Sequence, residues 1–350
     1  MLPKRLVFCG GGTRCLVFVQ ALLELETKGK LVEVKECWGT SAGAMIASLY
    51  TLTKSSEKVK EHMFQADYLK FRDIDISNIF GIQHSWGLDD GKSLTKELER
   101  IFESIEPGNK DKRLSDVEGL HIVVSDITLR ETIVCNSTTF PNLRIVDAIR
   151  ASMSLPIFFK PYVHESGNYW IDGALRANFP WDLLPNDKAR SESLGFTFEK
   201  THTHRSPKTF MEYIFSMVHF DEPKKQKVLR ERWSNHILWF SLPPYPAWYI
   251  RLQESDFRLI EQLGKEGVDT WTKSNESSPS KKIGTHPSSD HRHIPISACP
   301  PNHIGESSGI QTLDSHHCSH VDSSKPPLPP FESPHIQTSD TVPSCRRWSV

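Results

Sequence analysis

The sequence lacks several features that would place it in a common class of protein. Its 350 residues carry a formal net charge of −1, whereas proteins that mainly bind nucleic acid normally have a basic excess. No apolar run approaches the roughly 20 residues that a membrane-spanning helix needs. The basic N-terminus is followed by an apolar run too short for a secretory signal, because glycines interrupt it from Gly10 onward. We therefore expect a cytoplasmic protein that binds no nucleic acid and contacts membranes only peripherally.

Paired cysteines and a metal-binding pattern are also lacking. The 7 cysteines are an odd number, scattered from Cys9 to Cys345 without regular spacing, which favours reduced intracellular thiols over a disulfide framework. The cluster His316, His317, Cys318 and His320 does not have the spacing of a four-ligand zinc site. We predict no metal.

The composition changes sharply near Trp271 and divides the chain into two predicted parts, 1–271 and 272–350. In the second part Ser, Thr, Pro, His and Lys dominate, and no hydrophobic periodicity remains. Such a segment cannot bury enough apolar surface to offset the entropy of ordering, so we predict a disordered tail. Its run 325–330 (KPPLPP) suggests a weak polyproline II ligand for an SH3-type groove, although such runs also arise by chance in proline-rich tails.

In the first part, apolar strand patterns alternate with helical patterns. This order predicts a three-layer α/β/α sandwich with a mostly parallel central sheet. Strands are expected at 5–9, 34–38, 121–126, 131–136 and 169–171, and helices at 14–28, 42–53, 56–70, 93–105, 145–152 and 256–263.

Residues 39–43, Gly-Thr-Ser-Ala-Gly, match the G-x-S-x-G pattern and lie between a predicted strand and a predicted helix. A serine hydroxyl becomes an effective nucleophile only when it is exposed and held beside a base. A tight strand-to-helix turn provides that exposure, and Gly39 and Gly43 let the neighbouring elements approach closely. The alternative is a chance match in an ordinary loop, but the context favours Ser41 as a nucleophile.

A second glycine turn, residues 10–14 (GGGTR), follows the first predicted strand. A dinucleotide fingerprint would need a third glycine where Cys15 stands, and it would need an acidic residue at the end of the next strand. We instead interpret the backbone N–H groups of this loop as an oxyanion hole for a tetrahedral intermediate. No cofactor is predicted.

Asp172 directly follows the apolar strand 169–171 and precedes Gly173 and Ala174. An acid at the end of one strand can meet a serine at the end of another, and partial burial would raise its pKa towards neutrality, as a base requires. The histidines are poorer candidates for a base, since they lie at a strand start or in polar stretches: His121, His164, His202 and His204.

Taken in order, the three motifs resemble those of the patatin-like phospholipases. Supporting segments at 87–91, 125–126, 148–159 and 178–180 fit the same family, over roughly residues 4–271. The resemblance implies an α/β/α sandwich with a Ser–Asp dyad, in which Ser41 is the nucleophile and Asp172 is the general base. It further implies that Gly11 and Gly12 donate to the oxyanion, with Gly10 and Arg14 completing the loop.

The implied reaction is hydrolysis of fatty acyl esters through an acyl-serine, with phospholipids or neutral glycerolipids as substrates and no cofactor or metal. The expected location is then the cytoplasm, with transient contact at membranes or lipid droplets. Cys9 and Cys15 depart from the family, which usually has Asp and Gly at these positions.

Two other hypotheses remain open on the sequence. One is a catalytically weakened domain that binds lipid or acts as a scaffold. The other is a Ser–Asp–His esterase, in which a histidine such as His164 would be as essential as Ser41.

Overall fold

An eight-stranded sheet forms the centre of the molecule, in the order β10-β9-β1-β2-β4-β8-β7, with β5 paired to β4. The computed structural model describes residues 2–71, 73, 82, 84, 86–199, 222–242 and 252–277. The strands are β1 (Arg5–Phe8), β2 (Glu36–Thr40), β4 (Leu120–Asp126), β5 (Glu131–Cys135), β7 (Tyr162–Val163), β8 (Tyr169–Asp172), β9 (Ser193–Phe198) and β10 (Ile237–Phe240). Two further strands, β3 (Gly87–Asp89) and β6 (Ile157–Phe159), pair in parallel with each other.

The five strands from β10 to β4 run parallel, whereas β5, β7 and β8 join the sheet in antiparallel pairs. Strands of a parallel sheet are covered on both faces and are therefore apolar throughout. In β1, Leu6 and Phe8 point into the larger core cluster, and Val7 between them points into the smaller one on the opposite face. The mostly parallel sheet predicted from the sequence is confirmed.

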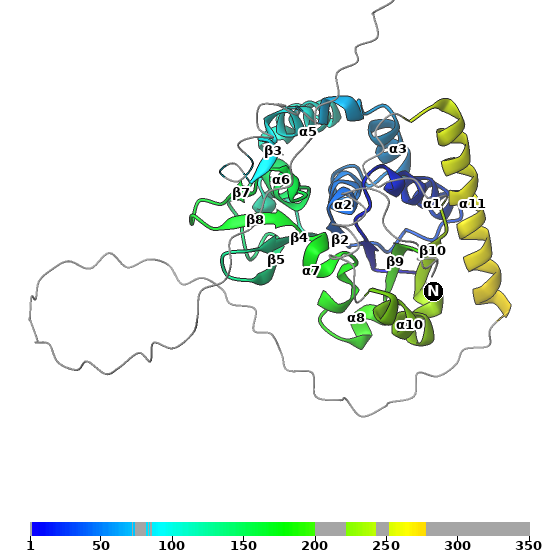
Figure 1. The fold of residues 1–350 in the computed structure, drawn as a ribbon. Helices are drawn as coiled ribbons and strands as arrows, with labels where there is room; N and C mark the ends of the chain where they lie inside the picture. The colour runs from blue at the N-terminus through cyan, green and yellow to red at the C-terminus, as the bar shows by residue number, and fades with distance from the viewer. Residues whose placement is uncertain are drawn as a thin grey trace, which may run out of the picture. The chain divides into compact units, whose positions relative to one another are not determined.

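Helices cover both faces of this sheet, which gives three layers (Figure 1). Helices α1, α2, α3, α5, α6 and α11 lie on one side, and α8 and α10 lie on the other. Their bounds are α1 (Leu16–Thr27), α2 (Ala42–Thr53), α3 (Ser56–Phe64), α5 (Lys92–Ile105), α6 (Ile145–Ser152), α7 (Ala174–Ala177), α8 (Asp187–Ser191), α10 (Glu222–Trp233) and α11 (Glu254–Ser277). Short 3₁₀ turns lie at Gly12–Cys15, Tyr68–Phe71, Asn109–Asp111, Leu114–Asp116, Pro180–Leu183 and Ser234–His236.

Several boundaries differ from the sequence expectation. Strand β2 continues to Thr40 and therefore reaches the turn that carries Ser41, whereas the predicted strand ended at residue 38. Helix α3 ends at Phe64, and a separate 3₁₀ turn covers Tyr68–Phe71. Helix α11 passes the predicted boundary at residue 271 and ends at Ser277. The rest of the predicted tail, with its proline run and histidine cluster, lies outside the described residues.

Strand β4 organises the region where β2 ends. Its first half pairs with β2, and Thr40 lies opposite Val123. Its second half pairs with β8 in the opposite direction, and Asp172 lies opposite Val124. Because β5 occupies the other edge of β4 over Ile122 to Asp126, β2 and β8 must share one edge. The residue after β2 and the last residue of β8 therefore meet.

No helix in the described ranges is both long enough and apolar enough to cross a membrane.

Candidate active site

Ser41 lies between β2 and α2 with its backbone at φ 54° and ψ −126°. A positive φ is unusual for a residue with a side chain and persists only where the surrounding structure imposes it. The Ser41 side chain does not cap helix α2. Instead its hydroxyl donates a 2.7 Å hydrogen bond to Oδ2 of Asp172. The turn thus presents the hydroxyl to a carboxylate at the N-terminus of a helix, where developing negative charge is favoured.

The two glycines of the turn are required by close backbone packing. A Cβ on Gly39 would lie 2.3 Å from the carbonyl oxygen of Gly43, and one on Gly43 would lie 2.5 Å from that of Cys9. Helix α2 can therefore approach β2 only without a side chain at Gly39, and the end of β1 only without one at Gly43. This contact also brings the Cys9 backbone, and the glycine loop that follows it, against the start of α2.

Asp172 is buried, with only 3 % of its surface exposed. Its Oδ1 accepts a 2.8 Å hydrogen bond from the Ala174 amide, and its Oδ2 accepts the Ser41 hydroxyl. Burial disfavours the charged carboxylate and raises the pKa of Asp172 to about 7, although both hydrogen bonds act in the opposite direction. The side chain is fixed at both oxygens, and its proton affinity suits proton exchange near neutral pH.

Ser152 and Ser154, which lie outside the predicted site, hold the backbone of Ser41 and Asp172. The Ser41 amide donates to Oγ of Ser152 at 2.8 Å, and that hydroxyl donates to the Val123 carbonyl at 2.6 Å. The Asp172 amide donates to the Ser154 carbonyl at 2.9 Å. The end of α6 and the turn after it therefore set the relative position of Ser41 and Asp172. No local sequence signal indicates this role, because the partners of Ser152 are distant in the chain.

Arg150 anchors the same turn from within the protein. It is 4 % exposed, and its guanidinium donates to the carbonyls of Asp90 at 3.2 Å and Lys160 at 3.1 Å and to the Ser154 hydroxyl. A Cβ on Gly91 would lie 2.0 Å from this guanidinium, so the supporting Gly-Leu-Asp-Asp-Gly segment needs its last glycine to make room. Arg150 thus ties the segment after β3 to the turn that holds Asp172.

The glycine loop lies directly beside Ser41. A Cβ on Gly10 would be 3.0 Å from the Ser41 Cβ. The Gly10 amide donates to the Asn178 carbonyl at 3.1 Å, so Gly10 positions the loop, and its N–H already has an acceptor. Within the described residues the amides of Gly11 and Gly12 have no acceptor. Gly12 has φ 59°, a conformation that glycine adopts without strain.

Arg14 supports this loop from its side chain. Its Nε donates to the Gly11 carbonyl at 3.3 Å, and its guanidinium lies 4.9 Å from the centre of the Phe198 ring. Cys15 is completely buried, and its thiol lies 3.6 Å from the Cys9 carbonyl as a weak donor. Burial raises the pKa of the Cys15 thiol well above its ordinary value, so the thiol stays protonated and unreactive. Cys15 therefore packs beneath the loop.

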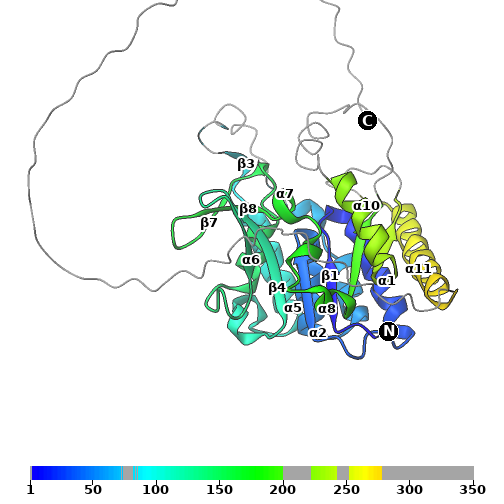
Figure 2. The same cartoon turned by 90° about the horizontal axis from the view of Figure 1, so that it is seen from below.

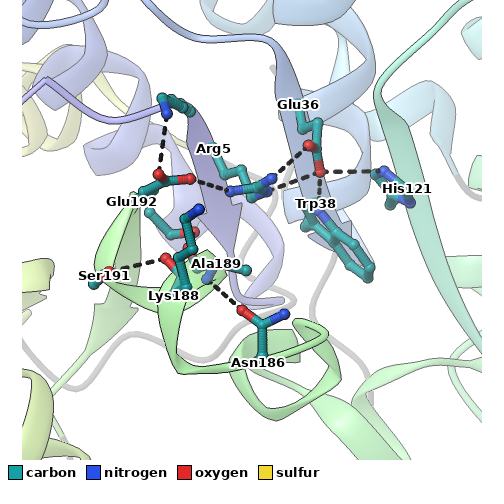
Figure 3. A network of polar contacts seen from close by, with 11 residues as sticks. Arg5, Glu36, Trp38, His121, Asn186, Lys188, Ala189, Ser191 and Glu192 are labelled. Atoms are coloured by element: carbon teal, nitrogen blue, oxygen red, sulfur yellow. Dashed lines mark hydrogen bonds and ion pairs between the residues drawn. The ribbon is translucent and has the colours of Figure 1, made fainter.

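The histidine candidates lie elsewhere. His121 stacks on Trp38 with ring centres 3.9 Å apart, and its Nε2 is 3.7 Å from Glu36. Figure 3 shows these residues in a polar network with Arg5, near the strand ends opposite Ser41. His164 contacts Ser166 at 2.8 Å and stacks on Trp170. Neither ring contacts Asp172, and His202 and His204 lie outside the described residues.

In the part of the chain that the structure describes, no group of three or more His, Cys, Asp or Glu side chains could hold a metal ion. The four cysteines described there, Cys9, Cys15, Cys37 and Cys135, are free and buried.

Known proteins give this geometry a family context. The sequence model of the patatin-like phospholipases matches residues 6–185, a range that includes both Ser41 and Asp172. Uncharacterized protein R571 of Acanthamoeba polyphaga mimivirus is 25% identical over 222 residues, which cover 61% of this chain and 74% of the viral protein. Probable lipid hydrolase 463L of Invertebrate iridescent virus 6 is 25% identical over 186 residues, 51% of this chain and 62% of that protein.

Among solved structures, VipD from Legionella pneumophila has the same fold, with a TM-score of 0.56 and 14% sequence identity. The alignment covers 78% of this chain and 67% of VipD. The family model spans half of the chain and includes the strand-to-helix turn, the glycine loop and the buried aspartate. The chain belongs to the patatin-like phospholipase family.

Proposed function

We propose that this protein hydrolyses fatty acyl esters of phospholipids or neutral glycerolipids, with Ser41 as the nucleophile and Asp172 as the general base. The observation that carries the proposal is the 2.7 Å hydrogen bond from the Ser41 hydroxyl to the buried Asp172 carboxylate. Membership of the patatin-like phospholipase family supports lipid hydrolysis. A carboxylate with a pKa of about 7 supports direct proton transfer without a histidine.

The first step forms an acyl-serine. Ser41 Oγ attacks the ester carbonyl carbon while its proton passes to Oδ2 of Asp172. The carbonyl oxygen becomes an oxyanion, and the amides of Gly11 and Gly12 are the donors proposed to stabilise it. When the intermediate collapses, the C–O bond to the leaving alcohol breaks, and Asp172 returns the proton to that alcohol.

The second step releases the fatty acid. Water attacks the acyl carbon while Asp172 accepts its proton, and a second tetrahedral intermediate forms in the same donor loop. Its collapse breaks the bond to Ser41 Oγ, which recovers its proton from Asp172. The same carboxylate therefore serves both steps, which requires it to gain and lose a proton readily near neutral pH.

The test compares hydrolysis of a panel of phospholipids and acylglycerols by the wild type and by single variants. We expect Ser41→Ala and Asp172→Asn each to reduce kcat by about 10⁴-fold or more, since nucleophile and base act as a unit. His164→Ala is the matched control and should keep wild-type activity. Wild-type hydrolysis by either dyad variant would contradict the assignment, and inactivity of His164→Ala would favour the Ser–Asp–His alternative.

Labelling with a fluorophosphonate separates hydrolysis from simple lipid binding, because the reagent reacts only with an activated serine. We expect one label on Ser41 in the wild type and none in Ser41→Ala. Unlabelled wild type that still binds lipid would instead support the weakened, scaffold-like domain.

A further inference from the structure

Large apolar side chains are exposed at one end of the sheet. Four of the eight exposed large apolar side chains in the described part of the chain gather there: Trp86 at 50%, Ile127 at 44%, Leu129 at 48% and Val163 at 57%. Single exposed apolar residues are ordinary on a protein surface, whereas a contiguous group indicates a contact surface. With the partly exposed Tyr169, these residues form what we call the apolar patch.

Hydrogen bonds and ring contacts make the patch continuous. The Ile127 amide donates to the Tyr169 carbonyl at 3.0 Å, and the Tyr169 amide donates to the Thr128 hydroxyl at 3.0 Å. The Trp86 ring meets the Tyr169 ring edge-on, with centres 5.1 Å apart. Val163 lies opposite Tyr169 in the β7–β8 pair, so both side chains project from the same face.

The turn that carries Ile127 and Leu129 is held rigidly. Buried Asp126 accepts the amides of Thr128 and Leu129 at 2.8 Å and 2.9 Å through Oδ1. Its Oδ2 accepts the Asn168 amide group at 2.8 Å and the Trp170 indole N–H at 3.0 Å. Both oxygens of Asp126 thus accept hydrogen bonds and fix the turn so that its apolar side chains face water. This exposure is unfavourable unless another surface covers the side chains.

The patch lies at the end of the sheet that carries Ser41 and Asp172. Strand β4 passes its pairing with Asp172 at Val124 and continues to the turn with Ile127 and Leu129. Strand β8 begins at Tyr169 and ends at Asp172. In Figure 2, β3, β8 and α7 lie toward one end of the molecule and the N-terminus lies at the other. A surface that touches the patch thus faces the end of the sheet that carries Ser41 and Asp172.

Cationic side chains accompany the patch. Arg130 is exposed at the tip of the same turn, and it has no ion-pair or hydrogen-bond partner among the described residues. Arg176, exposed on α7, lies beside β5 with its Nε 3.4 Å from the Thr132 hydroxyl. The acidic neighbours are Glu131, at the start of β5, and Glu165, on the turn between β7 and β8. An apolar tip carrying arginine, with a Trp–Tyr pair beside it, suits the boundary between lipid headgroups and acyl chains.

We propose that the apolar patch is the surface through which this protein docks on phospholipid membranes that contain anionic lipid. The proposal rests on the proposed function, because the docked orientation directs the Ser41–Asp172 end of the sheet at the bilayer. Ile127, Leu129 and Trp86 enter the interface, and Arg130 and Arg176 contact anionic headgroups.

The experiment measures binding to vesicles of phosphatidylcholine with phosphatidylserine, by co-sedimentation of full-length Ser41→Ala protein. This background keeps vesicles intact and tests docking whether or not the protein is a hydrolase. Combining Ile127→Ser with Leu129→Ser should weaken binding by about tenfold or more, because two aliphatic side chains no longer enter the apolar part of the interface. Val32→Ser is the matched control, since Val32 is 75% exposed before β2, away from the dyad, and it should bind like the parent.

The charge is tested separately. Arg130→Gln should weaken binding to phosphatidylserine-containing vesicles by about fivefold, the effect of about 1 kcal/mol for one cation near an anionic surface. Binding to pure phosphatidylcholine should change little. An equal loss on both vesicle types would contradict the role given to Arg130.

Activity distinguishes failure of docking from failure of the proposed function. In protein that retains Ser41, the variant with both Ile127→Ser and Leu129→Ser should lose hydrolysis of vesicle lipid but keep hydrolysis of a soluble short-chain ester. Absence of all esterase activity in the wild type would overturn the proposed function alone. Unchanged vesicle binding by the double variant would overturn the docking surface, and a dimer that only this variant dissociates would assign the patch to a second copy of the chain.

Discussion

Asp172 shows how one residue's chemistry depends on its surroundings. An exposed aspartate is ionised at neutral pH and is a weak base, whereas burial of this carboxyl raises its pKa to about 7. The Ala174 amide and the Ser41 hydroxyl limit this rise because both stabilise the ionised form. The proposed mechanism uses both properties, because the side chain is ionised enough to accept a proton and basic enough to retain it.

This shift predicts the pH dependence of the reaction. Below about pH 7 the folded-state carboxyl of Asp172 is protonated and cannot accept the Ser41 proton. We expect kcat/KM for a neutral, soluble ester to rise about tenfold per pH unit up to this region and then level off. A pH–rate profile checks this, with circular dichroism at each pH to show that the fold is retained. A rate that stays constant down to pH 5 would contradict a base with a raised pKa.

Individual residues of the site differed in how far the sequence could predict them. Ser41 could be predicted locally, because its turn, glycines and flanking apolar segments are contiguous. Asp172 depended on the order of the family motifs, since nothing local shows that β2 and β8 meet on β4. Ser152 could not be predicted, because its partners are the Ser41 amide and the Val123 carbonyl, which only the tertiary structure brings together.

At the scale of an element, the end of α6 and the turn after it position both residues of the proposed dyad. Ser152 holds the Ser41 amide, and the Ser154 carbonyl holds the Asp172 amide. Arg150 secures the turn by filling the space that Gly91 leaves. Two residues that are far apart in sequence are thus positioned by one short segment.

Removing the Ser152 hydroxyl tests whether the end of α6 positions Ser41. Ser152→Ala leaves the Ser41 amide and the Val123 carbonyl without their buried partner, which should cost about 1–3 kcal/mol of unfolding free energy. Because Ser41 then loses its fixed position, kcat should fall by about 10- to 100-fold with little change in KM. Urea unfolding and steady-state kinetics on a soluble ester provide the measurements.

Ser48→Ala is the matched control for this substitution. Ser48 is also a buried serine, but its hydroxyl donates to the Ala44 carbonyl within α2 and has no link to the dyad. It should lose at most a little stability and keep kcat. Equal loss of kcat in both variants would show that Ser152 acts only through general stability.

Helices and strands with a periodic hydrophobic pattern were predicted well. Elements whose extent depends on contacts with neighbouring elements were predicted poorly. The core helices and β1 followed from hydrophobic periodicity. Strands β9 and β10 were not predicted. In β9, Gly195 interrupts the apolar side chains, and the rings of Phe179 and Trp181 lie in the space beside it. Helix α11 continues past the change in composition near residue 271, where Trp271 packs against the core and the Asn275 side chain donates to the Asn235 carbonyl at 3.3 Å.

Across the whole molecule, the proposed dyad and the ion pairs of Arg5 lie at opposite ends of the sheet. At the end away from the dyad, Arg5 pairs with Glu36 at 2.9 Å and with Glu192 at 3.3 Å (Figure 3). These pairs connect β1 to β2 and to the segment that enters β9. The pairs also raise the pKa of Arg5, against the effect of its burial. The network can hold three strands in register without touching the site.

Arg5→Ala tests this separation. The substitution leaves Glu36 without its partly buried cation, which should lower the unfolding free energy by about 1–3 kcal/mol, less than for a fully buried pair. The kcat of the folded enzyme should not change. Lys4→Ala is the control, because Lys4 pairs only at the surface with Glu192 and should matter much less. A fall in kcat for Arg5→Ala at a temperature where it is folded would show that the two ends are coupled.

Because β2 and β8 both pair with β4, the contact between Ser41 and Asp172 depends on correct assembly of the sheet. Ser41 and Asp172 meet only if β2 and β8 both settle in register along one edge of β4. A slip of β8 by a single residue would turn the Asp172 side chain to the opposite face. In a chain that is newly made, misfolded or partly unfolded, Ser41 does not lie beside Asp172, so under the proposed mechanism its hydroxyl lacks the base that would activate it.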